Sequence, residues 1–434
     1  MKVLLVGDNR TSLNWGRGAD IALYELLSRK YHISGLIPGS YFILDLAGFG
    51  YVNTFTPPRF YWAFSYLVSN RKRRKIFDWY VKLEELWGAK DFINEDPEKS
   101  VENLLCHKKR YRELSVIYCE AEEADLIVVN GDGDLIFTTP PRREVLFLLA
   151  MAELGMRLKK KVFFINSMIS DCPLTGRNLK TLASARSVLS KCQAVALRDP
   201  VSLEYVRKEM PEVNCTYIPD SLFALYPSFE KSRSYLPADG NFAIPYPEQN
   251  EYLGKLDFSK PYICVGGTAL ASQEGERLIT GYLRLLTEIK KLGYEIYLTE
   301  NDGPDSFLRE IAITNNFGLI PARTPIFMAG AILANAKLFI SGRYHPSIFA
   351  SFGGTPCIFL ESHAHKMSSL QKVLEYGGSK QFSAFPDDSE MSEIVSTARI
   401  YLDQGEVLRD KIRNVAAKRC EEARQLPAFI ESKI

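Results

Sequence analysis

One stretch near the end of the chain, residues 337–367, restricts the fold more than any other. It reads KLFISGRYHPSIFASFGGTPCIFLESHAHKM. The apolar run Lys337–Ser341 is bounded by a glycine, as in a buried parallel strand, and Pro346 suits the start of a helix because that position needs no donor. A glycine pair then ends the helix, and a second apolar run follows at Thr355–Leu360. The stretch therefore predicts a strand, a helix and a second strand of an open α/β sheet.

Arg343 and His345 fall on the turn between the first strand and the helix. Turns at the carboxyl ends of parallel strands bind ligands in open α/β sheets, and a helix N-terminus offers free N–H groups to an anion. A guanidinium grips carboxylate or phosphate with two N–H groups, and a histidine exchanges a proton near neutral pH. The turn thus indicates chemistry on a small anion, or else a tight turn with a salt-bridged arginine and a capping histidine. The next strand brings further polar residues to the same rim: Glu361, His363, His365 and Lys366.

Length and composition indicate a soluble globular protein with more than one domain. At 434 residues the chain is too long for one ordinary core, so two or three domains are expected. The net charge of +2 gives no overall attraction for nucleic acid, which we do not expect as a partner. The eight cysteines have neither close pairs nor metal-finger spacing, and no apolar run in the sequence is long enough to cross a bilayer. Because residues 1–6 read as a first strand and not as a signal peptide, we expect a cytoplasmic protein with reduced thiols.

The pattern of strand, turn and helix recurs in both halves of the chain. Between Tyr226 and Pro261 the sequence is rich in proline, serine, glycine and charge and has no sustained periodicity, which is typical of a linker. The strand pattern then restarts at Tyr262. We therefore predict an α/β fold of two doubly wound, Rossmann-like domains facing a cleft, with an N-terminal domain at residues 1–228, a linker at 229–260 and a C-terminal domain at 261–434. The last helix, Met391–Gln425, should be interrupted near Gly405.

Polar residues follow the predicted strands of the first half. The turn after the first strand carries Asn14 and Arg17 as candidate ligands, although its glycines match neither the dinucleotide fingerprint nor the P-loop. Asn130, Asp132 and Asp134 lie in a glycine–aspartate turn after another apolar run. A carboxylate at Asp132 could deprotonate a sugar hydroxyl or hold one by hydrogen bonds, yet such turns are also common without function.

The segment Arg198-Asp199-Pro200 repeats the geometry of strand, arginine, turn and helix. Asp199 is the natural N-cap of that helix. Arg198 is harder to explain by packing, so we count it among the candidate functional residues.

A segment near residues 60–88 differs in character, because aromatic residues bracket the basic cluster Arg71–Lys75. Basic, aromatic-rich helices can lie on an anionic membrane surface, and such a surface would suit an acceptor held on a lipid. The alternative is a solvated corner between helices whose aromatics belong to the core. The basic cluster therefore indicates either peripheral membrane contact or a solvated corner between helices.

The order and spacing of several short motifs resemble the polysaccharide pyruvyl transferase family. The resemblance covers most of the chain and is weakest at residues 40–110 and in the linker. Family members have a two-domain, glycosyltransferase-B-like fold and move the enolpyruvyl unit of phosphoenolpyruvate onto a sugar, usually forming a pyruvate ketal across two hydroxyls. One departure is that the turn at residues 130–133 is Asn-Gly-Asp-Gly where members often have a glycine-rich turn. The motifs are Asn14-Trp-Gly16, Asn130-Gly-Asp-Gly133, Leu197-Arg-Asp-Pro-Val-Ser202, Ile218-Pro-Asp-Ser221, Ser341-Gly-Arg-Tyr-His345, Gly354-Thr-Pro356 and Lys366.

The resemblance implies roles for individual residues. It puts Arg198 and Arg343 on the carboxylate and phosphate of the donor and His345 in acid–base catalysis. Asp132 is a further catalytic candidate, which comes from the chemistry of its turn and not from the resemblance. The C-terminal domain would be the donor side and the N-terminal domain the acceptor side. The reaction needs no metal or cofactor in principle, and the His363-Ala-His365 pair is a poor zinc site because Glu361 is its one obvious carboxylate partner. Further candidates are Ser341, Gly342 and Lys366 for the donor, and Asn14, Arg17, Asn130 and Asp134 for the acceptor.

The leading functional hypothesis is therefore a ketal-forming pyruvyl transferase that acts on a glycan or a lipid-linked glycan precursor. A glycosyltransferase of the same architecture with a nucleotide-sugar donor is the second hypothesis, because an arginine and a helix N-terminus serve a diphosphate equally well. A non-catalytic protein that binds a glycan or an anion is the third, since fold alone does not establish chemistry.

Overall fold

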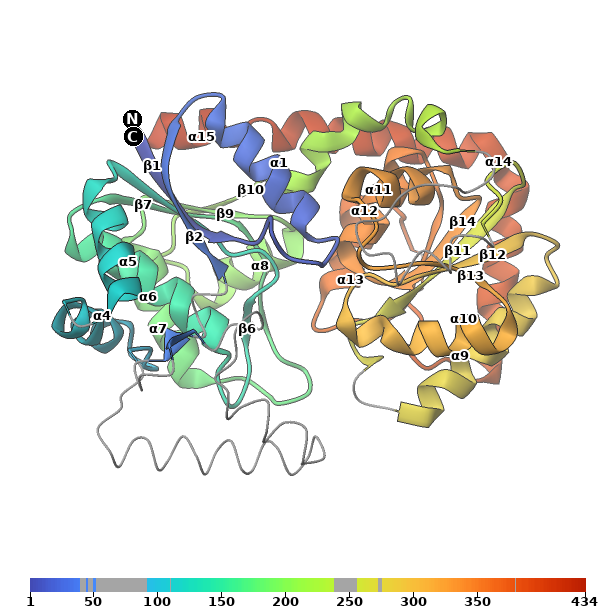
Figure 1. Cartoon of the computed structure of the whole chain (residues 1–434), viewed down its shortest axis with the longest axis horizontal. Helices are drawn as coiled ribbons and strands as arrows, with labels where there is room; N and C mark the ends of the chain where they lie inside the picture. The colour runs from blue at the N-terminus through green and yellow to red at the C-terminus, as the bar shows by residue number, and fades with distance from the viewer. Residues whose placement is uncertain are drawn as a thin grey trace.

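The computed structural model describes residues 1–39, 44–45, 50–51, 92–109, 111–237, 256–271, 275–378 and 380–434. These residues form two α/β halves that lie side by side (Figure 1). The aromatic and basic segment near residues 60–88, with Arg71–Lys75, lies outside the described residues, as do residues 238–255 of the predicted linker.

The N-terminal half is built on a parallel sheet with the strand order β10-β9-β7-β5-β1-β2. Every neighbouring pair in this sheet is parallel, so the carboxyl ends of its strands share one edge. The strands are β1 (Lys2–Asp8), β2 (His32–Pro38), β5 (Leu126–Asn130), β7 (Lys161–Ser167), β9 (Ala194–Leu197) and β10 (Cys215–Tyr217). The helices are α1 (Arg17–Ser28), α4 (Pro97–His107), α5 (Arg112–Glu123), α6 (Arg143–Arg157), α7 (Leu179–Lys191) and α8 (Pro200–Glu209).

The C-terminal half has a second parallel sheet, with the order β13-β12-β11-β14-β15. Its strands are β11 (Tyr262–Thr268), β12 (Glu295–Thr299), β13 (Gly318–Ile320), β14 (Leu338–Gly342) and β15 (Cys357–Phe359). Its helices are α9 (Gly275–Lys290), α10 (Phe307–Asn315), α11 (Ile326–Asn335), α12 (Tyr344–Phe352) and α13 (Lys366–Val373). Shorter elements are the pairs β3 (Leu44–Asp45) with β4 (Gly50–Tyr51) and β6 (Leu135–Phe137) with β8 (Ile169–Asp171), and the 3₁₀ helices η2 (Ser221–Phe229), η3 (Ser232–Tyr235) and η6 (Gly303–Ser306).

Burial explains why the central strands are continuously apolar. All five residues of β5 and all five of β14 are buried, because helices cover both faces of each sheet. The predicted class of two doubly wound domains is confirmed. The bounds predicted for β14 and α12 differ from the observed bounds by less than three residues. Pro346 is the third residue of α12 and not the first, which the helix tolerates because the N–H groups of the whole first turn lack intrahelical partners.

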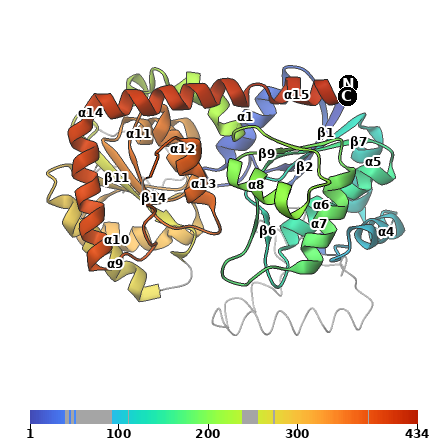
Figure 2. The same ribbon diagram turned by 180° about the vertical axis from the view of Figure 1, so that it is seen from behind.

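The last two helices join the halves. Helix α14 (Asp388–Ala423) contains the non-helical Gly405, at φ 52°, so the predicted interruption is confirmed. Beyond α14 the chain crosses to the N-terminal half, where α15 (Leu426–Lys433) lies (Figure 2). Leu426 and Ile430 of α15 join the core cluster that contains Val3 and Leu5 of β1. The hydroxyl of Tyr31 also donates to the carbonyl of Pro427 at 3.2 Å. The final segment of the predicted C-terminal domain thus contributes to the core of the N-terminal half.

The turn after β1 docks on the other half. Trp15 is fully buried in the core of the C-terminal half, and its indole Nε1 donates to the carbonyl of Ala322 at 3.0 Å.

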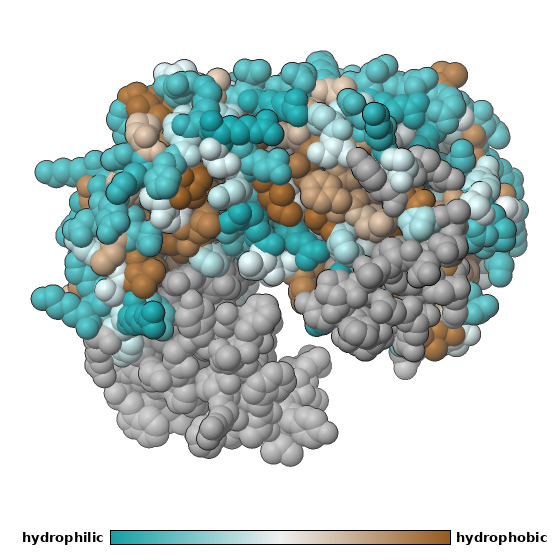
Figure 3. Space-filling model, turned by 45° about the horizontal axis from the view of Figure 1, so that its top comes forward, coloured by the Kyte–Doolittle hydropathy of each residue, from teal (hydrophilic) through white to brown (hydrophobic). Residues whose placement is uncertain are grey.

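Hydrophilic residues gather in the middle of the molecule, where the two halves adjoin (Figure 3). Among the described residues, no helix has the length and apolar character needed to cross a membrane. All eight cysteines are free thiols.

Candidate active site

Arg198 forms the centre of a charged cluster between the halves. It follows the buried strand β9, and Asp199 caps the next helix by accepting from the backbone N–H of Ser202 at 2.8 Å, as the sequence predicts. The Arg198 side chain is 1% exposed. Its Nη1 donates to the carboxylates of Asp132 and Asp220, the latter at 3.0 Å, and its guanidinium carbon lies 4.3 Å from the ring centroid of Tyr344. The two carboxylates belong to the N-terminal half, as Arg198 does, and Tyr344 is its contact with the C-terminal half.

His345 reaches the same point from the other half. It lies in the first turn of α12, and its Nε2 is 3.5 Å from Oδ1 of Asp132, 3.5 Å from Oδ2 of Asp220 and 3.4 Å from Nη1 of Arg198. Gly16 packs over the other side of the ring, since a Cβ there would lie 2.9 Å from Nδ1. The site is therefore completed only by residues from both halves.

The charges in this cluster favour a protonated imidazole. Burial disfavours the charged form of His345, but the carboxylates of Asp132 and Asp220 outweigh it and raise the pKa of His345 to about 9. Burial alone would raise the pKa of the Asp132 carboxyl. The nearby Arg198 and His345 outweigh burial and keep this pKa well below its usual range. At neutral pH His345 can therefore act as an acid, whereas Asp132 is a weak base that accepts hydrogen bonds.

Two cationic side chains in the cluster keep free donors. Lys366 begins α13, and burial together with the nearby Arg198 lowers the pKa of its ammonium to about 8. Neither Nζ of Lys366 nor Nε and Nη2 of Arg198 has a hydrogen-bond acceptor within the part of the chain that the structure describes. Both groups border Gly133, where a Cβ would lie 2.7 Å from Nζ and 2.9 Å from Nη2. This arrangement suits a small anion, because two cationic groups with unused donors border the same place.

Arg343 has different partners from those of Arg198. Its Nε and Nη2 donate to Asp305 at 3.0 Å and 2.7 Å, and its Nη2 and Nη1 donate to Asp302 at 2.7 Å and 3.1 Å. Burial raises the pKa of Asp305 to about 6, although Arg343 opposes this shift. Lys366 also acts on Asp302, so Arg343 lies near the cluster, but protein carboxylates engage most of its donors.

The other two residues predicted near the donor serve the backbone of the C-terminal half. The hydroxyl of Ser341 accepts from the N–H of Arg343 at 3.1 Å and donates to the carbonyl of Gly267 at 3.2 Å. Gly342 packs where a Cβ would come within 2.6 Å of the carbonyl oxygen of Glu361. Both residues therefore shape the turn that carries Arg343 and His345.

Two of the predicted acceptor residues bridge the halves instead of facing open space. Asn14 donates from Nδ2 to Asp302 at 3.3 Å, and Arg17 donates from Nη2 to the carbonyl of Thr324 at 3.1 Å. These contacts tie the turn after β1 to the C-terminal half.

The remaining two acceptor candidates lie in the N-terminal half. Asn130 is buried, and its amide nitrogen donates to Asp20 at 2.8 Å while its oxygen accepts from Asn166 at 3.2 Å. Asp134 accepts from Arg142 at 3.1 Å, and burial raises the pKa of Asp134 while Arg142 opposes the shift. Asp134 is also among the charged groups that act most strongly on Lys366.

Sequence reasoning missed Asp220 as a site residue. It is fully buried, caps η2 by accepting from the N–H of Leu222 at 2.9 Å, and presents its second oxygen to Arg198 and His345. A signal was available, because Asp220 lies three residues after the end of the edge strand β10 and the carboxyl ends of neighbouring parallel strands meet at one edge.

Asp132, Asp220 and His345 are residue types that bind metal ions. One ligand atom from each lies within 4.8 Å of the others. However, Nη1 of Arg198 already lies within hydrogen-bonding distance of all three side chains. The guanidinium therefore supplies the positive charge that a metal ion would bring.

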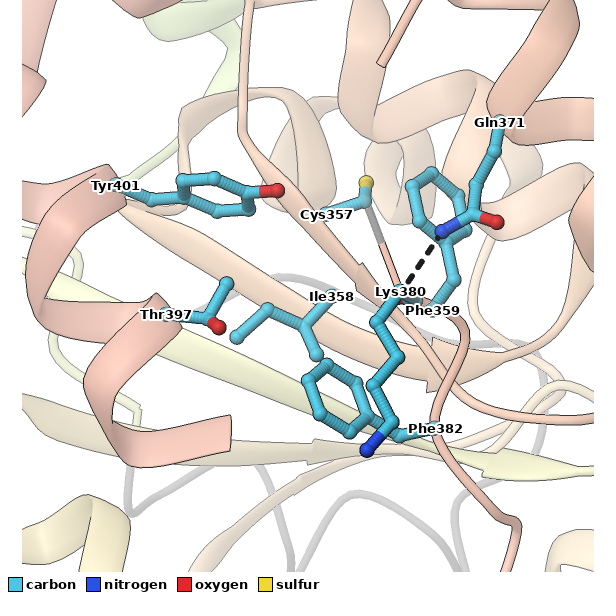
Figure 4. Close-up of a pocket in the computed structure, with 8 residues that line it drawn as sticks. All are labelled: Cys357, Ile358, Phe359, Gln371, Lys380, Phe382, Thr397 and Tyr401. Carbon is cyan, nitrogen blue, oxygen red and sulfur yellow. Dashed lines mark hydrogen bonds between the residues drawn. The ribbon is translucent and has the colours of Figure 1, made fainter. Parts of the chain in front are cut away.

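A separate cavity of about 210 Å³ lies beside β15 in the C-terminal half. Figure 4 shows Thr397 and Tyr401 of α14 facing Cys357 and Ile358 across it, with Phe382 on another side. No residue predicted to act on donor or acceptor lines this cavity, so the charged cluster between the halves remains the candidate active site.

Comparisons with known proteins agree with this architecture. A sequence model described as polysaccharide pyruvyl transferase matches residues 21–363. No curated protein matches the chain. Among solved structures, the UDP-GlcNAc 2-epimerase of Neisseria meningitidis bound to UDP-GlcNAc aligns over 100% of both chains at 11% identity with a TM-score of 0.54. UGT71G1 of Medicago truncatula, complexed with UDP-glucose, aligns over 99% of this chain and 98% of its own at 8% identity with a TM-score of 0.51. Likeness at such low identity shows the fold, which is the predicted glycosyltransferase-B-like pair of Rossmann-like domains.

Proposed function

Because the chain belongs to the polysaccharide pyruvyl transferase family, we propose that it transfers the enolpyruvyl group of phosphoenolpyruvate to a sugar of a glycan or lipid-linked glycan precursor and closes it into a pyruvate ketal. The observation that carries the proposal is the convergence of free donors from Arg198 and Lys366 beside a protonated His345. Phosphoenolpyruvate carries two anionic groups on the carbon beside the methylene that must be protonated, and this site offers two cations and an acid.

In the proposed reaction the Nε2 proton of His345 passes to the methylene carbon of the donor. The neighbouring carbon gains cationic character, one sugar hydroxyl adds to it, phosphate leaves, and a second hydroxyl closes the ketal. Of the two hydroxyl protons, one replaces the proton that His345 gave and the other leaves with the phosphate. Arg198 and Lys366 hold the departing phosphate and the carboxylate, and their fixed positive charge stabilises the leaving group.

The proposal gives the two aspartates of the cluster different tasks. Asp220 is fully buried and holds Arg198, so it acts as the counter-ion that keeps His345 protonated. Asp132 has a side chain that is 26% exposed, so its carboxylate can also accept a hydrogen bond from the attacking hydroxyl. Arg343 would reach the donor only by releasing Asp302 or Asp305, and its role as a donor ligand is tested separately below.

The direct test is release of phosphate from phosphoenolpyruvate in the presence and absence of acceptor, over a panel of glycans and lipid-linked saccharides. We expect release that depends on acceptor, and mass spectrometry should show an acceptor that has gained one pyruvate less one water. Binding of phosphoenolpyruvate with no product across the panel would instead favour the non-catalytic hypothesis.

The nucleotide-sugar hypothesis is separated by thermal denaturation. A ligand that binds only the native state raises the melting temperature in proportion to the logarithm of its concentration. We expect phosphoenolpyruvate to stabilise the protein and UDP to leave the melting temperature unchanged. Stabilisation by UDP alone would overturn the proposal in favour of a glycosyltransferase.

A further inference from the structure

A second polar contact joins the halves next to the cluster. His365 comes directly before α13, and its Nε2 lies 3.1 Å from the hydroxyl of Ser202 and 3.3 Å from Oδ1 of Asp199, both in the first turn of α8. Ser202 and Asp199 are fully buried. Nothing in the proposed reaction uses this contact, so it requires its own explanation.

The three residue types are those of a nucleophilic triad, but their hydrogen bonds exclude that reading. The one proton of the Ser202 hydroxyl is donated to Oδ2 of Asp199 at 2.7 Å, and the Ser202 hydroxyl oxygen accepts from the N–H of Ile169 at 3.0 Å. His365 must therefore donate from Nε2 to Ser202 or to Asp199. A base that activates serine would have to accept that proton, so the contact is a link between the halves.

The position of the link in the sequence connects it to the site. His365 precedes Lys366, and Asp199 follows Arg198, so two consecutive residues of one half face two consecutive residues of the other. Lys366 and Arg198 carry like charges and repel each other across Gly133. The contact of His365 with Ser202 and Asp199 lies one residue away and opposes this repulsion.

We propose that His365 is a positioning residue whose contact with Ser202 and Asp199 holds the two halves closed and thereby keeps the Lys366 ammonium beside Arg198. The identity of the anion rests on the proposed function, but the closure itself does not. Other contacts between the halves do not involve His365 and stay in place when it is changed. The contacts from Trp15 to Ala322 and from Arg17 to Thr324 lie on the turn after β1, and His345 meets Asp132 and Asp220 within the cluster. Loss of His365 therefore opens the side of α8 and α13 and leaves the halves joined.

The test compares His365→Ala, His365→Gln and Ser202→Ala with the unchanged protein. Ser190→Ala is the control, because Ser190 is an exposed serine whose one hydrogen bond among the described residues is to the carbonyl of Ser187 in its own helix. Small-angle X-ray scattering without substrate measures the opening, circular dichroism verifies folding, and initial rates at varied phosphoenolpyruvate give KM and kcat separately.

We expect His365→Ala to show a larger radius of gyration than the unchanged protein and a KM for phosphoenolpyruvate raised about tenfold, with a smaller change in kcat. Ser202→Ala should show part of this effect. His365→Gln should bring the radius of gyration and KM most of the way back to the values of the unchanged protein, because the amide nitrogen can still donate to Ser202. A merely structural role would lower stability without this rescue and without the change in KM.

The inference is overturned if His365→Ala has the scattering profile of the unchanged protein. If the unchanged protein turns over no phosphoenolpyruvate, the proposed function fails, and the scattering comparison without substrate still decides whether His365 closes the halves.

Discussion

Arg198 and Arg343 occupy equivalent places in the two halves but have different surroundings. Each follows a buried parallel strand and precedes a helix that carries a proline in its first turn. Arg198 meets a histidine from the opposite half and keeps two nitrogens without acceptors among the described residues. Arg343 meets Asp302 and Asp305 of its own half, which engage all three of its nitrogens.

This difference separates two uses of a buried guanidinium. An arginine whose three nitrogens all donate to carboxylates of its own domain neutralises them and orders the local backbone, and removing one partner leaves an uncompensated charge. An arginine with free donors at a boundary between domains can still receive a ligand. Chemistry is therefore expected at Arg198 and its neighbours, and structural support at Arg343.

The largest effect is expected for His345→Ala. This variant removes the acid that protonates the donor, and loss of a general acid lowers the rate by about 10²–10⁴-fold. Phosphate release from phosphoenolpyruvate measures it, with His32→Ala as the control, because His32 is exposed at the start of β2. Near-normal turnover by a folded His345→Ala protein would remove His345 from the mechanism.

The comparison itself is tested by Arg198→Lys against Arg343→Lys. Both variants keep the positive charge and lose the planar fork of donors. Arg198→Lys should lower kcat/KM by about 10²-fold, because donors aimed at the leaving group are lost. Arg343→Lys should instead lower the free energy of unfolding by about 2 kcal/mol or more, because Asp302 and Asp305 lose hydrogen bonds.

Urea denaturation and steady-state rates on both variants give the answer. The reverse result, with stability lost only at Arg198 and turnover lost only at Arg343, would show that Arg343 releases its aspartates and binds the donor.

The sequence was sufficient to predict the parts of the site that depend on local pattern. The apolar runs located β9 and β14, which places Arg198 and Arg343 after strands, and the order of Asp199 and Pro200 predicted the cap and start of α8. The glycine at 405 predicted the break in α14, because its φ of 52° lies in the region that favours glycine. Each of these features is decided by a few consecutive residues.

Partners across the chain could not be predicted in this way. Asp132 and Asp220 reach Arg198 from 66 and 22 residues away, and Asp305 reaches Arg343 from 38. Asn130 looked like a surface ligand on its turn, but the packing of α1 beside β5 supplies Asp20 as its buried partner. Which carboxylate meets which cation depends on how two sheets and their helices pack, and a periodic pattern does not contain that information.

A smaller effect is expected for Gly133→Ala. The added Cβ would lie 2.7 Å from Nζ of Lys366 and 2.9 Å from Nη2 of Arg198, so the two free donors must move apart. We expect KM for phosphoenolpyruvate to rise about tenfold with little change in folding, since the far ends of flexible side chains can move. Gly281→Ala is a matched control, because nothing lies within 4 Å of its Cβ position in α9. An unchanged KM in Gly133→Ala would move the anion away from this glycine.

The finest test of the comparison is the pH dependence of kcat/KM. His345 acts as an acid, so its contribution is present at lower pH and is lost as the pH rises through its pKa of about 9. Lys366, with a pKa of about 8, loses its charge in the same direction, so the alkaline fall contains both groups. Asp220→Asn separates them, because Asp220 raises the pKa of His345 but is not among the groups that act most strongly on Lys366.

Asparagine at position 220 keeps the size of the side chain and can still accept from the N–H of Leu222. With one carboxylate gone, the pKa of His345 falls, and we expect the upper limb of the profile to move to lower pH by about one unit. Asp403→Asn, at an exposed position on α14, should leave the profile unchanged. If the limb of Asp220→Asn stays where it was, Lys366 alone sets the alkaline fall, and the role of Asp220 is limited to holding Arg198 in place.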